Sequence, residues 1–452
     1  MASAFIYLGI MLAVICLWFI LLKRPVYEAV FVSFILLVAI TNKWSSLWGY
    51  IQSGLETSLL YSMVVFVAMS LLLSKTKIID STVNIILALL GKVPGGAGYV
   101  SVIASAFMGS LSGSGPGNVM TTGVITIPAM KKSGFPAELA ANIESNASYL
   151  GNMIPPSSNI VAALGAYLAL YPNENLTIGR FWLVCWGCSL WFVLLKMVMV
   201  FAFCKYYKVK PMNTDDLPSI KETFKNSWQG LLLPFIILVP FVLDFIFKDT
   251  FFTNRLGEVG AKYFSSSLLF FVAGVASIYT VIVTKDKKSV TPNKIAKMFG
   301  EKIKSISPAI GTCLFGYMIG SLFNDLNVAE GLELGFEALN VGKFGFALII
   351  PLFTCFLGMV IPGSSLVVMF GSVFIALFAN VDINPLLVAA MLPCICGVMC
   401  GITPPLALGM YAGISIAESD FGKTVRNGMW WVVTQYLLEV IVLLGLLPII
   451  GL

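Results

Sequence analysis

Apolar residues form long, nearly uninterrupted blocks along most of this chain, and short polar segments separate the blocks. A helix that crosses the hydrocarbon core of a bilayer needs about 20 consecutive apolar residues. Blocks near this length predict eight membrane-spanning helices, at residues 4–22, 26–41, 57–74, 181–204, 229–247, 265–284, 307–324 and 427–450. The pattern is typical of an all-α polytopic membrane protein.

Two further regions, residues 98–171 and 345–417, are apolar but are interrupted by Gly, Pro, Ser and Asn. A continuous lipid-exposed helix does not tolerate such interruptions, because the backbone groups freed at a break must be satisfied inside the protein. We therefore expect each region to form a re-entrant helical hairpin followed by a broken crossing helix. The helix breaks are predicted at Pro155-Pro156 and at Pro404-Pro405.

The two interrupted regions superpose without a gap when the chain is shifted by 249 residues against itself. This shift places Gly109 on Gly358 and the first Pro-Pro pair on the second. Chance matching would not bring both elements into register at one offset. The two regions are therefore interpreted as an internal repeat.

The positions of the 28 Lys and Arg residues predict the orientation. If the N-terminus lies outside and each hairpin returns to its own side, 21 cations are cytoplasmic, six are external, and Lys196 lies within a span. Cytoplasmic loops carry an excess of Lys and Arg, which favours this orientation and places the C-terminus outside as well. The two repeats then have opposite orientations, and inverted repeats with broken helices are typical of secondary transporters.

Composition narrows the class of protein. The chain is 58% hydrophobic and 11% charged, which excludes a soluble enzyme. It has no histidine, which removes Ser-His and Cys-His nucleophiles and histidine zinc sites. All nine cysteines lie in apolar stretches and are interpreted as buried small side chains. We expect no enzymatic activity, no cofactor beyond a coupling ion, and no nucleic-acid partner.

The Gly, Pro, Ser and Asn residues that interrupt the two apolar regions are the candidate binding residues. The first hairpin tip, residues 109–118, reads Gly-Ser-Leu-Ser-Gly-Ser-Gly-Pro-Gly-Asn, and its counterpart is residues 358–365, Gly-Met-Val-Ile-Pro-Gly-Ser-Ser. Glycine-rich tips and proline pairs leave backbone carbonyls without helical partners. These carbonyls, with Ser, Thr and Asn oxygens, would form an oxygen cage suited to an alkali cation.

Helix N-termini are also predicted to converge at the breaks, near Asn118, Ser365, Pro156 and Pro405. Their partial positive charges favour an anionic group by about 0.3 to 2 kcal/mol each. The site as a whole therefore suits a cation beside an organic anion such as a carboxylate. The alternative is that Gly and Pro only kink packed helices. Candidate substrate contacts are Ser114, Asn118, Ser157 and Ser365.

Two ionisable residues lie within predicted helices, where each is costly. Glu144 follows Asn142-Ile143 and precedes the first proline pair. It is a candidate coupling carboxylate, as a proton carrier or indirect cation ligand, but a carboxyl that is hydrogen-bonded within the bundle explains it equally well. For Lys196, snorkelling or pairing with a neighbouring helix is favoured over contact with substrate.

The interrupted regions resemble the large membrane subunit of TRAP (tripartite ATP-independent periplasmic) transporters. Residues 112–135 read Ser-Gly-Ser-Gly-Pro-Gly-Asn-Val-Met-Thr-Thr-Gly-Val-Ile-Thr-Ile-Pro-Ala-Met-Lys-Lys-Ser-Gly-Phe, and residues 154–157 read Ile-Pro-Pro-Ser. Residues 402–413, Ile-Thr-Pro-Pro-Leu-Ala-Leu-Gly-Met-Tyr-Ala-Gly, are similar to the second repeat of that family. The Asn-Val-Met-Thr-Thr-Gly segment and Glu144 resemble the branch that pairs with TAXI-type binding proteins.

This resemblance implies an elevator-type, sodium-coupled importer of organic acids in the bacterial or archaeal cytoplasmic (inner) membrane. It also implies an extracytoplasmic solute-binding protein and a small four-helix membrane subunit, which is not fused to this chain. One departure is Gly-Pro-Gly at residues 115–117, where the family usually has other small residues. By position, the sodium-site motifs carry over to Ser112, Ser114, Gly115, Asn118, Asn152, Pro155, Pro156, Gly363, Ser364, Ser365, Thr403, Pro404 and Pro405.

The predicted transport domain comprises residues 95–171 and 345–417. It would slide against a scaffold of residues 1–94, 172–344 and 418–452, with arm helices near 77–92 and 327–342. Two alternatives to sodium-coupled import stay open. One is a proton-coupled or exchange transporter of organic anions that uses Glu144 without a binding protein. The other, less favoured, is a channel or structural membrane component.

Overall fold

The computed structural model describes residues 2–452 except 19–21, 23, 57, 77, 173, 175, 213–216, 218, 285, 329–330, 332–340, 360 and 405. The described residues contain helices and no strand, so the all-α prediction is confirmed. The helices are α1 (Ala2–Cys16), α2 (Val26–Ile40), α3 (Leu47–Glu56), α4 (Ser58–Lys75), α5 (Ile78–Leu90), α6 (Gly96–Ser112), α7 (Gly115–Lys132), α8 (Ala137–Leu150), α9 (Ser158–Leu170), α10 (Ile178–Tyr207), α11 (Ile220–Ser227), α12 (Leu233–Phe247), α13 (Thr253–Val283), α14 (Pro292–Asp325), α16 (Lys343–Gly358), α17 (Gly363–Ala379), α18 (Pro385–Pro393), α19 (Leu408–Ala417) and α20 (Phe421–Leu443).

Several helices are suited to a bilayer. By length and apolarity, four described segments could cross a membrane, and a fifth could if the pair α3 and α4, bent by 45°, counts as one span. In the other predicted spans most of the described residues are also helical. The helices α1 and α2 have 15 residues each, whereas α14 and α20 are longer and include charged residues.

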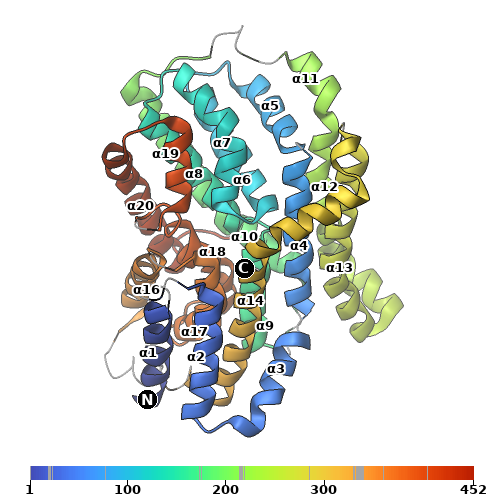
Figure 1. Ribbon diagram of the computed structural model, residues 1–452, viewed down its shortest axis with the longest axis vertical. Coiled ribbons are helices and arrows are strands. Elements are labelled where there is room, and N and C mark those ends of the chain that lie inside the picture. The colour runs from blue at the N-terminus through green and yellow to red at the C-terminus, as the bar shows by residue number, and fades with distance from the viewer. Residues whose placement is uncertain are drawn as a thin grey trace.

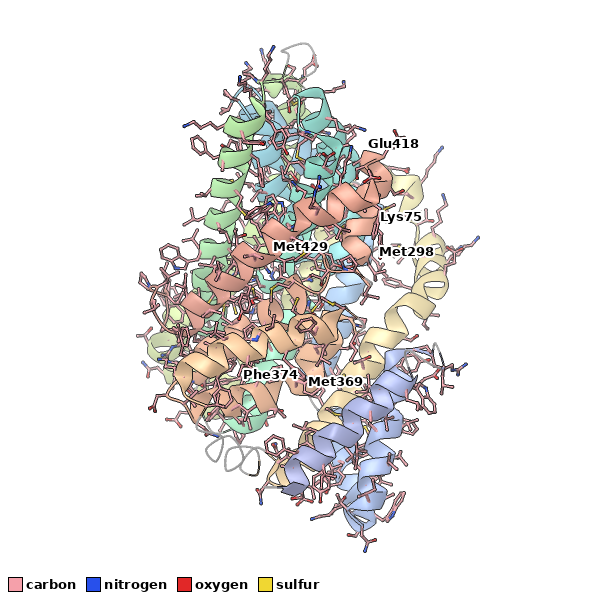
Figure 2. All side chains as sticks on the ribbon, turned by 90° about the vertical axis from the view of Figure 1, so that its left-hand side faces the viewer. Lys75, Met298, Met369, Phe374, Glu418 and Met429 are labelled. Carbon is pink, nitrogen blue, oxygen red and sulfur yellow. The ribbon has the colours of Figure 1, made fainter. Side chains whose placement is uncertain are left out.

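Helix α14 begins well before the predicted span at residues 307–324. It starts at Pro292, a residue whose fixed φ suits the first helical position, and Lys297 lies 3.9 Å from Glu301 one turn later. The apolar pattern marks where a helix meets lipid, whereas the helix itself extends farther. Figure 2 shows α14 running along one side of the molecule, with α1 and α2 at its lower part.

Both repeats contain the predicted helix breaks. In the first, α6 and α7 form a hairpin whose helices are separated by Gly113 and Ser114, and a 3₁₀ turn and proline pair separate α8 from α9. In the second, residues 359–362 separate α16 from α17, and a π-helix and a nonhelical segment separate α18 from α19. The hairpin α6–α7 lies in the upper half of Figure 1 and α16–α17 in the lower half. Helix α5 occupies the predicted first arm, and the second arm lies largely outside the described residues.

The internal repeat is also visible in one packing contact. Gly109 lies so close to Gly151 that a Cβ on Gly109 would be 3.1 Å from Cα of Gly151. In the second repeat, Gly358 has the same relation to Cys400, whose side chain occupies the space of a Cβ. A shift of 249 residues converts the first pair into the second. Each hairpin therefore packs on the broken helix of its own repeat in the same way.

We expect Gly151→Ala to lower the thermal stability of the protein. The added methyl group would lie 2.6 Å from the backbone N of Ser110 and would overlap the backbone of Gly109, which cannot move aside cheaply. Overpacking of this kind costs about 1 to 3 kcal/mol. Thermal unfolding of the purified protein measures the effect. Gly300→Ala is the control, since its methyl group would meet no atom within 4 Å, and equal unfolding temperatures would contradict the packing.

Lys196, in the middle of α10, is completely buried and joins three helices. Its Nζ donates hydrogen bonds to Oδ1 of Asn146 on α8, at 3.0 Å, and to Oε1 of Gln435 on α20, at 2.7 Å. It also lies 5.3 Å from the centre of the Trp431 ring. Lys196 is thus paired with neighbouring helices, as the sequence indicated, and α10 and α20 are joined through it to the first repeat.

Candidate functional site

A cavity of about 140 Å³ lies where the two hairpin tips meet the two broken helices. Segments from both repeats, far apart in the sequence, therefore surround one space. The described residues that line it are Gly113, Ser114, Gly115, Pro116, Tyr149, Asn152, Asn159, Pro362, Gly363, Ser364, Gly397, Cys400, Gly401, Leu406 and Leu408.

Four helices present their N-terminal ends at this cavity. Gly115 and Gly363 begin α7 and α17, Asn159 is the second residue of α9, and Leu408 begins α19. The first N–H groups of a helix lack helical partners and carry partial positive charge. The hydroxyl of Ser114 accepts one of them, from Gly117 at 3.3 Å, and so caps α7. The backbone around the cavity therefore favours an anionic group.

Asn152 contributes an oxygen that suits a cation. It lies in the 3₁₀ turn after α8, is 6% exposed and lines the cavity. Its Oδ1 is buried and has no hydrogen-bond partner among the described residues. A buried polar atom without a partner costs about 1 to 3 kcal/mol. A hard cation that prefers oxygen ligands would remove this cost.

The structure brings five of the predicted sodium-site residues to the cavity: Ser114, Gly115, Asn152, Gly363 and Ser364. Others form hydrogen bonds elsewhere. Nδ2 of Asn118 donates to the carbonyl of Ser105, at 2.7 Å, and to Oγ of Ser148, at 2.9 Å. The predicted residues that are not among those described as lining the cavity are Ser112, Asn118, Pro155, Pro156, Ser157, Ser365, Thr403 and Pro404, and Pro405 lies outside the described residues.

Three of these residues use their hydroxyls in local hydrogen bonds. The hydroxyls of Ser112 and Thr403 donate to backbone carbonyls of their own segments, at 3.3 and 2.9 Å. The Ser157 hydroxyl caps α9 by accepting from the N–H of Asn159, at 3.2 Å. A Ser or Thr near a helix end often bonds to its own backbone, and its presence in a motif does not reveal which partner it uses.

Glu144 does not line the cavity but lies completely buried between α6, α7 and α8. Each of its two carboxylate oxygens accepts several hydrogen bonds, at distances of 2.5 to 3.0 Å. This arrangement agrees with the interpretation of a carboxyl that is satisfied within the bundle, and a role in coupling stays a prediction. The hydroxyl donors are Ser101, Ser105, Thr122, Thr126 and Ser148.

The sequence interpretation missed Tyr149 and Cys400, which also line the cavity. An aromatic residue and a cysteine in apolar helices are normally core residues, so their types gave no signal. What distinguishes Tyr149 is the set of glycines around its ring, and these come from segments that meet only in the folded chain.

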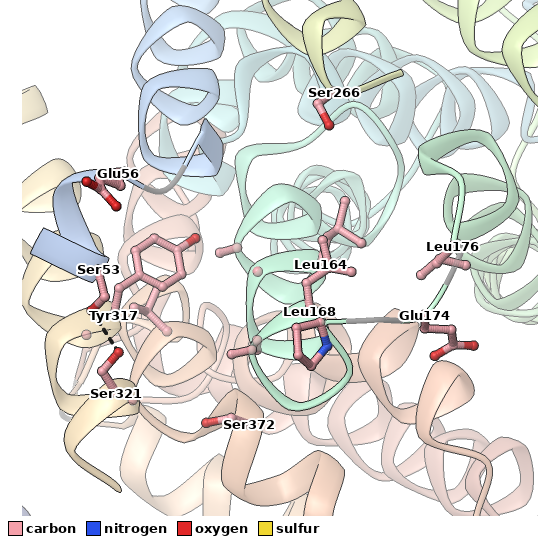
Figure 3. A pocket seen from close by; sticks show the side chains of 18 of the residues that line it. Ser53, Glu56, Leu164, Leu168, Glu174, Leu176, Ser266, Tyr317, Ser321 and Ser372 are labelled. Carbon is pink, nitrogen blue, oxygen red and sulfur yellow. Dashed lines mark hydrogen bonds between the residues drawn. The ribbon is translucent and has the colours of Figure 1, made fainter. Parts of the chain in front are cut away.

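A larger cavity, of about 650 Å³, lies elsewhere, and none of the predicted site residues is among those that line it. It is bounded by α9 and α17 of the repeats on one side and by α3, α13 and α14 on the other. Figure 3 shows Ser53, Tyr317, Ser321 and Ser372 around it, with Oγ of Ser53 2.7 Å from Oγ of Ser321. Small residues and hydroxyls form much of this boundary.

Comparison with known protein families matches residues 5–450 to the family described as Tripartite ATP-independent periplasmic transporter, DctM component. The chain belongs to this family. The resemblance to TRAP large membrane subunits is thereby confirmed, whereas the TAXI-type branch stays a prediction. As a member of the DctM family, the chain is a multi-pass permease component of the inner membrane.

Relatives of this DctM chain are named as transporter permeases. The C4-dicarboxylate TRAP transporter large permease protein DctM of Vibrio cholerae is 25% identical over 394 residues, which cover 83% of this chain and 82% of that protein. The sialic acid TRAP transporter large permease protein SiaM of the same organism is 22% identical over 381 residues, which cover 83% and 81%. The two names specify different substrates, a C4-dicarboxylate and sialic acid.

A solved structure shows the same fold. The chain aligns with the efflux pump MtrF of Neisseria gonorrhoeae with a TM-score of 0.65 and 13% identity, over 90% of this chain and 84% of that one. At this identity the likeness concerns the fold alone. The DctM chain therefore has the fold of a known transporter.

Proposed function

We propose that this TRAP permease is a sodium-coupled secondary importer of an organic acid. One observation carries the proposal: both tips and both helix breaks line a single cavity of about 140 Å³. Four helix N-termini there favour a carboxylate, and the unpaired Oδ1 of Asn152 favours a cation beside it. A cation and an anion that bind next to each other stabilise each other, which couples their transport.

We further propose an elevator mechanism in which the two repeats, residues 95–171 and 345–417, move as one body through the inner membrane. The cavity of about 650 Å³ between α9 and α17 and the helices α3, α13 and α14 supports this division, because small side chains on a boundary permit sliding. The helices α10 and α20 were predicted to belong to the scaffold, but the hydrogen bonds of Lys196 join them to the first repeat and support their addition to the moving body.

The proposed partners are an extracytoplasmic solute-binding protein, of TAXI type, and a separate small four-helix membrane subunit. Membership of the tripartite family supports both. The distribution of Lys and Arg supports an orientation with both termini outside. In this orientation the second hairpin tip is approached from the side on which the binding protein delivers substrate.

The coupling ion can be tested in proteoliposomes that contain the permease and its partners. The binding protein is first screened against organic acids, and the acid that it binds becomes the transported probe. We expect an inward sodium gradient to raise uptake about tenfold or more, equivalent to at least about 1.4 kcal/mol of driving force. Equal uptake with a proton gradient alone would refute sodium coupling.

A second candidate function is proton-coupled or exchange transport of organic anions through Glu144. The observation that favours it is a completely buried carboxyl on α8, the helix that ends at the cavity. In that case a proton gradient would drive uptake in the absence of sodium. A channel or structural component is less favoured. A channel predicts ungated conductance, whereas two repeats whose tips meet at one cavity predict turnover-limited flux.

A further inference from the structure

Tyr149 forms a bridge between the two repeats at the cavity. It lies near the end of α8, is 7% exposed, and lines the cavity together with both tips. Gly115, at the first hairpin tip, contacts the ring closely enough that a Cβ there would lie 2.7 Å from it. Gly401, in the second helix break, and Gly409, at the start of α19, are closer still, because a Cβ on either would overlap the ring.

Three glycines from two repeats therefore leave space for one aromatic side chain. Gly115 begins α7, Gly401 lies in the second helix break, and Gly409 is the second residue of α19. Backbone on several sides confines the ring, so it cannot change position without moving a helix end. Tyr149 is consequently a rigid part of the cavity wall.

The shift that relates the two repeats shows that only the first repeat contributes a large side chain to this wall. The shift of 249 residues places Tyr149 on Val398, which is buried but is not among the described residues that line the cavity. A large side chain in one repeat and a small one in the other make the cavity asymmetric. Its volume of about 140 Å³ is well below the roughly 300 to 1,000 Å³ of common ligand pockets.

We infer that Tyr149 is a specificity-determining residue that limits the length of the carboxylate held between the tips. The inference rests on the proposed function, since it assigns the cavity to an organic acid. With the ring in place, the cavity accepts a short, unbranched acid. Without the ring, the space between Gly115, Gly401 and Gly409 is added to the cavity, and a longer acid fits.

The reactivity of Cys400 reports on access to the cavity, because its free thiol lines the same cavity. Purified full-length protein is treated with iodoacetamide, and labelling at Cys400 is measured by peptide mass spectrometry. We expect Tyr149→Ala to speed this labelling about tenfold or more, because thiol reactivity follows access, and Tyr149→Phe to leave it unchanged. If Tyr149→Ala does not fold, Tyr149→Leu removes the ring while it keeps more apolar volume.

Protection of Cys400 then measures which acids bind. Malonate, succinate, glutarate and adipate are added in turn, and the longest acid that slows labelling is determined. We expect malonate and succinate to protect the native protein, and protection to extend to adipate in Tyr149→Ala. The control is Leu150→Ala, which removes a buried side chain on the same turn outside the cavity lining.

Two outcomes would overturn the inference: unchanged labelling of Cys400 in both ring-deleted variants, or the same length limit in native and variant proteins. A third outcome separates it from the proposed function. If labelling accelerates but no acid protects either protein, Tyr149 is confirmed as the cavity wall and the assignment of the cavity to carboxylates is refuted.

Discussion

Replacement of Lys196 by methionine is expected to lower the free energy of unfolding by about 3 to 5 kcal/mol. The lysine is completely buried, and its ammonium group donates to Asn146 and Gln435. Methionine has a similar length and no charge. The substitution therefore removes the polar contacts with little change in packing.

The loss is large because the acceptors stay buried after the donor is gone. The carboxyl of Glu439, also completely buried, interacts electrostatically with Lys196 and accepts a hydrogen bond from Sγ of Cys394, at 2.8 Å. Removal of the nearby positive charge leaves this group in an apolar interior without compensation. We therefore expect Glu439→Gln to restore part of the stability lost in Lys196→Met.

Chemical unfolding in mixed micelles measures these differences. The control is Lys205→Met, on the same helix, where the lysine is exposed. Its substitution removes one charge from the surface and is expected to change the free energy of unfolding by less than about 0.5 kcal/mol. Similar effects for both lysine variants would show that Lys196 does not join α8, α10 and α20.

The second large effect is expected in transport. In Gly363→Ala, the new methyl group would lie 2.5 Å from the carbonyl oxygen of Cys396 and would overlap Cα of Gly397. Both are backbone atoms of the second broken helix, so the tip that carries Gly363 must move away from it. A displacement of about 1 Å at a reacting site can reduce a rate about 100-fold, and we expect a loss of this size in the uptake rate.

Uptake into proteoliposomes and thermal unfolding are measured on the same preparation, so that a misfolded protein is recognised. The matched control is Gly274→Ala on α13, where an added Cβ would meet no atom within 4 Å. We expect the control to transport at the native rate. Uptake at the native rate by Gly363→Ala would contradict the close packing of tip and broken helix.

Much of the fold follows from the sequence because the bilayer imposes a simple pattern. The predicted span at residues 181–204 lies within α10, and the predicted span at 26–41 differs from α2 by one residue. The early starts of α13 and α14 were not predicted. These segments are polar, so the apolar pattern does not mark them, and in α14 the pair of Lys297 and Glu301 supports the helix instead.

The candidate site was predictable in part. The positions of the breaks followed from Gly and Pro, whose backbone properties are local. The convergence of Asn152 and Ser364 on one cavity followed from the internal repeat. The role of Tyr149 could not be predicted, because the glycines that receive its ring are far apart in the sequence. The hydrogen bonds that the Asn118 amide makes to α6 and α8 inside the first repeat could not be predicted for a similar reason, and its role in binding stays a prediction.

We propose that the cavity between the tips holds sodium and that Glu144 serves the structure of the first repeat. The most direct measurement is sodium-driven uptake by Asn152→Ala, Ser364→Ala and Glu144→Gln, compared with the native protein in one proteoliposome assay. We expect Asn152→Ala and Ser364→Ala each to weaken the sodium dependence about tenfold or more, since each removes a cavity oxygen worth about 1.4 kcal/mol or more. We expect Glu144→Gln to retain sodium-driven uptake. Loss of uptake in Glu144→Gln, with native sodium dependence in the other two variants, would contradict this proposal.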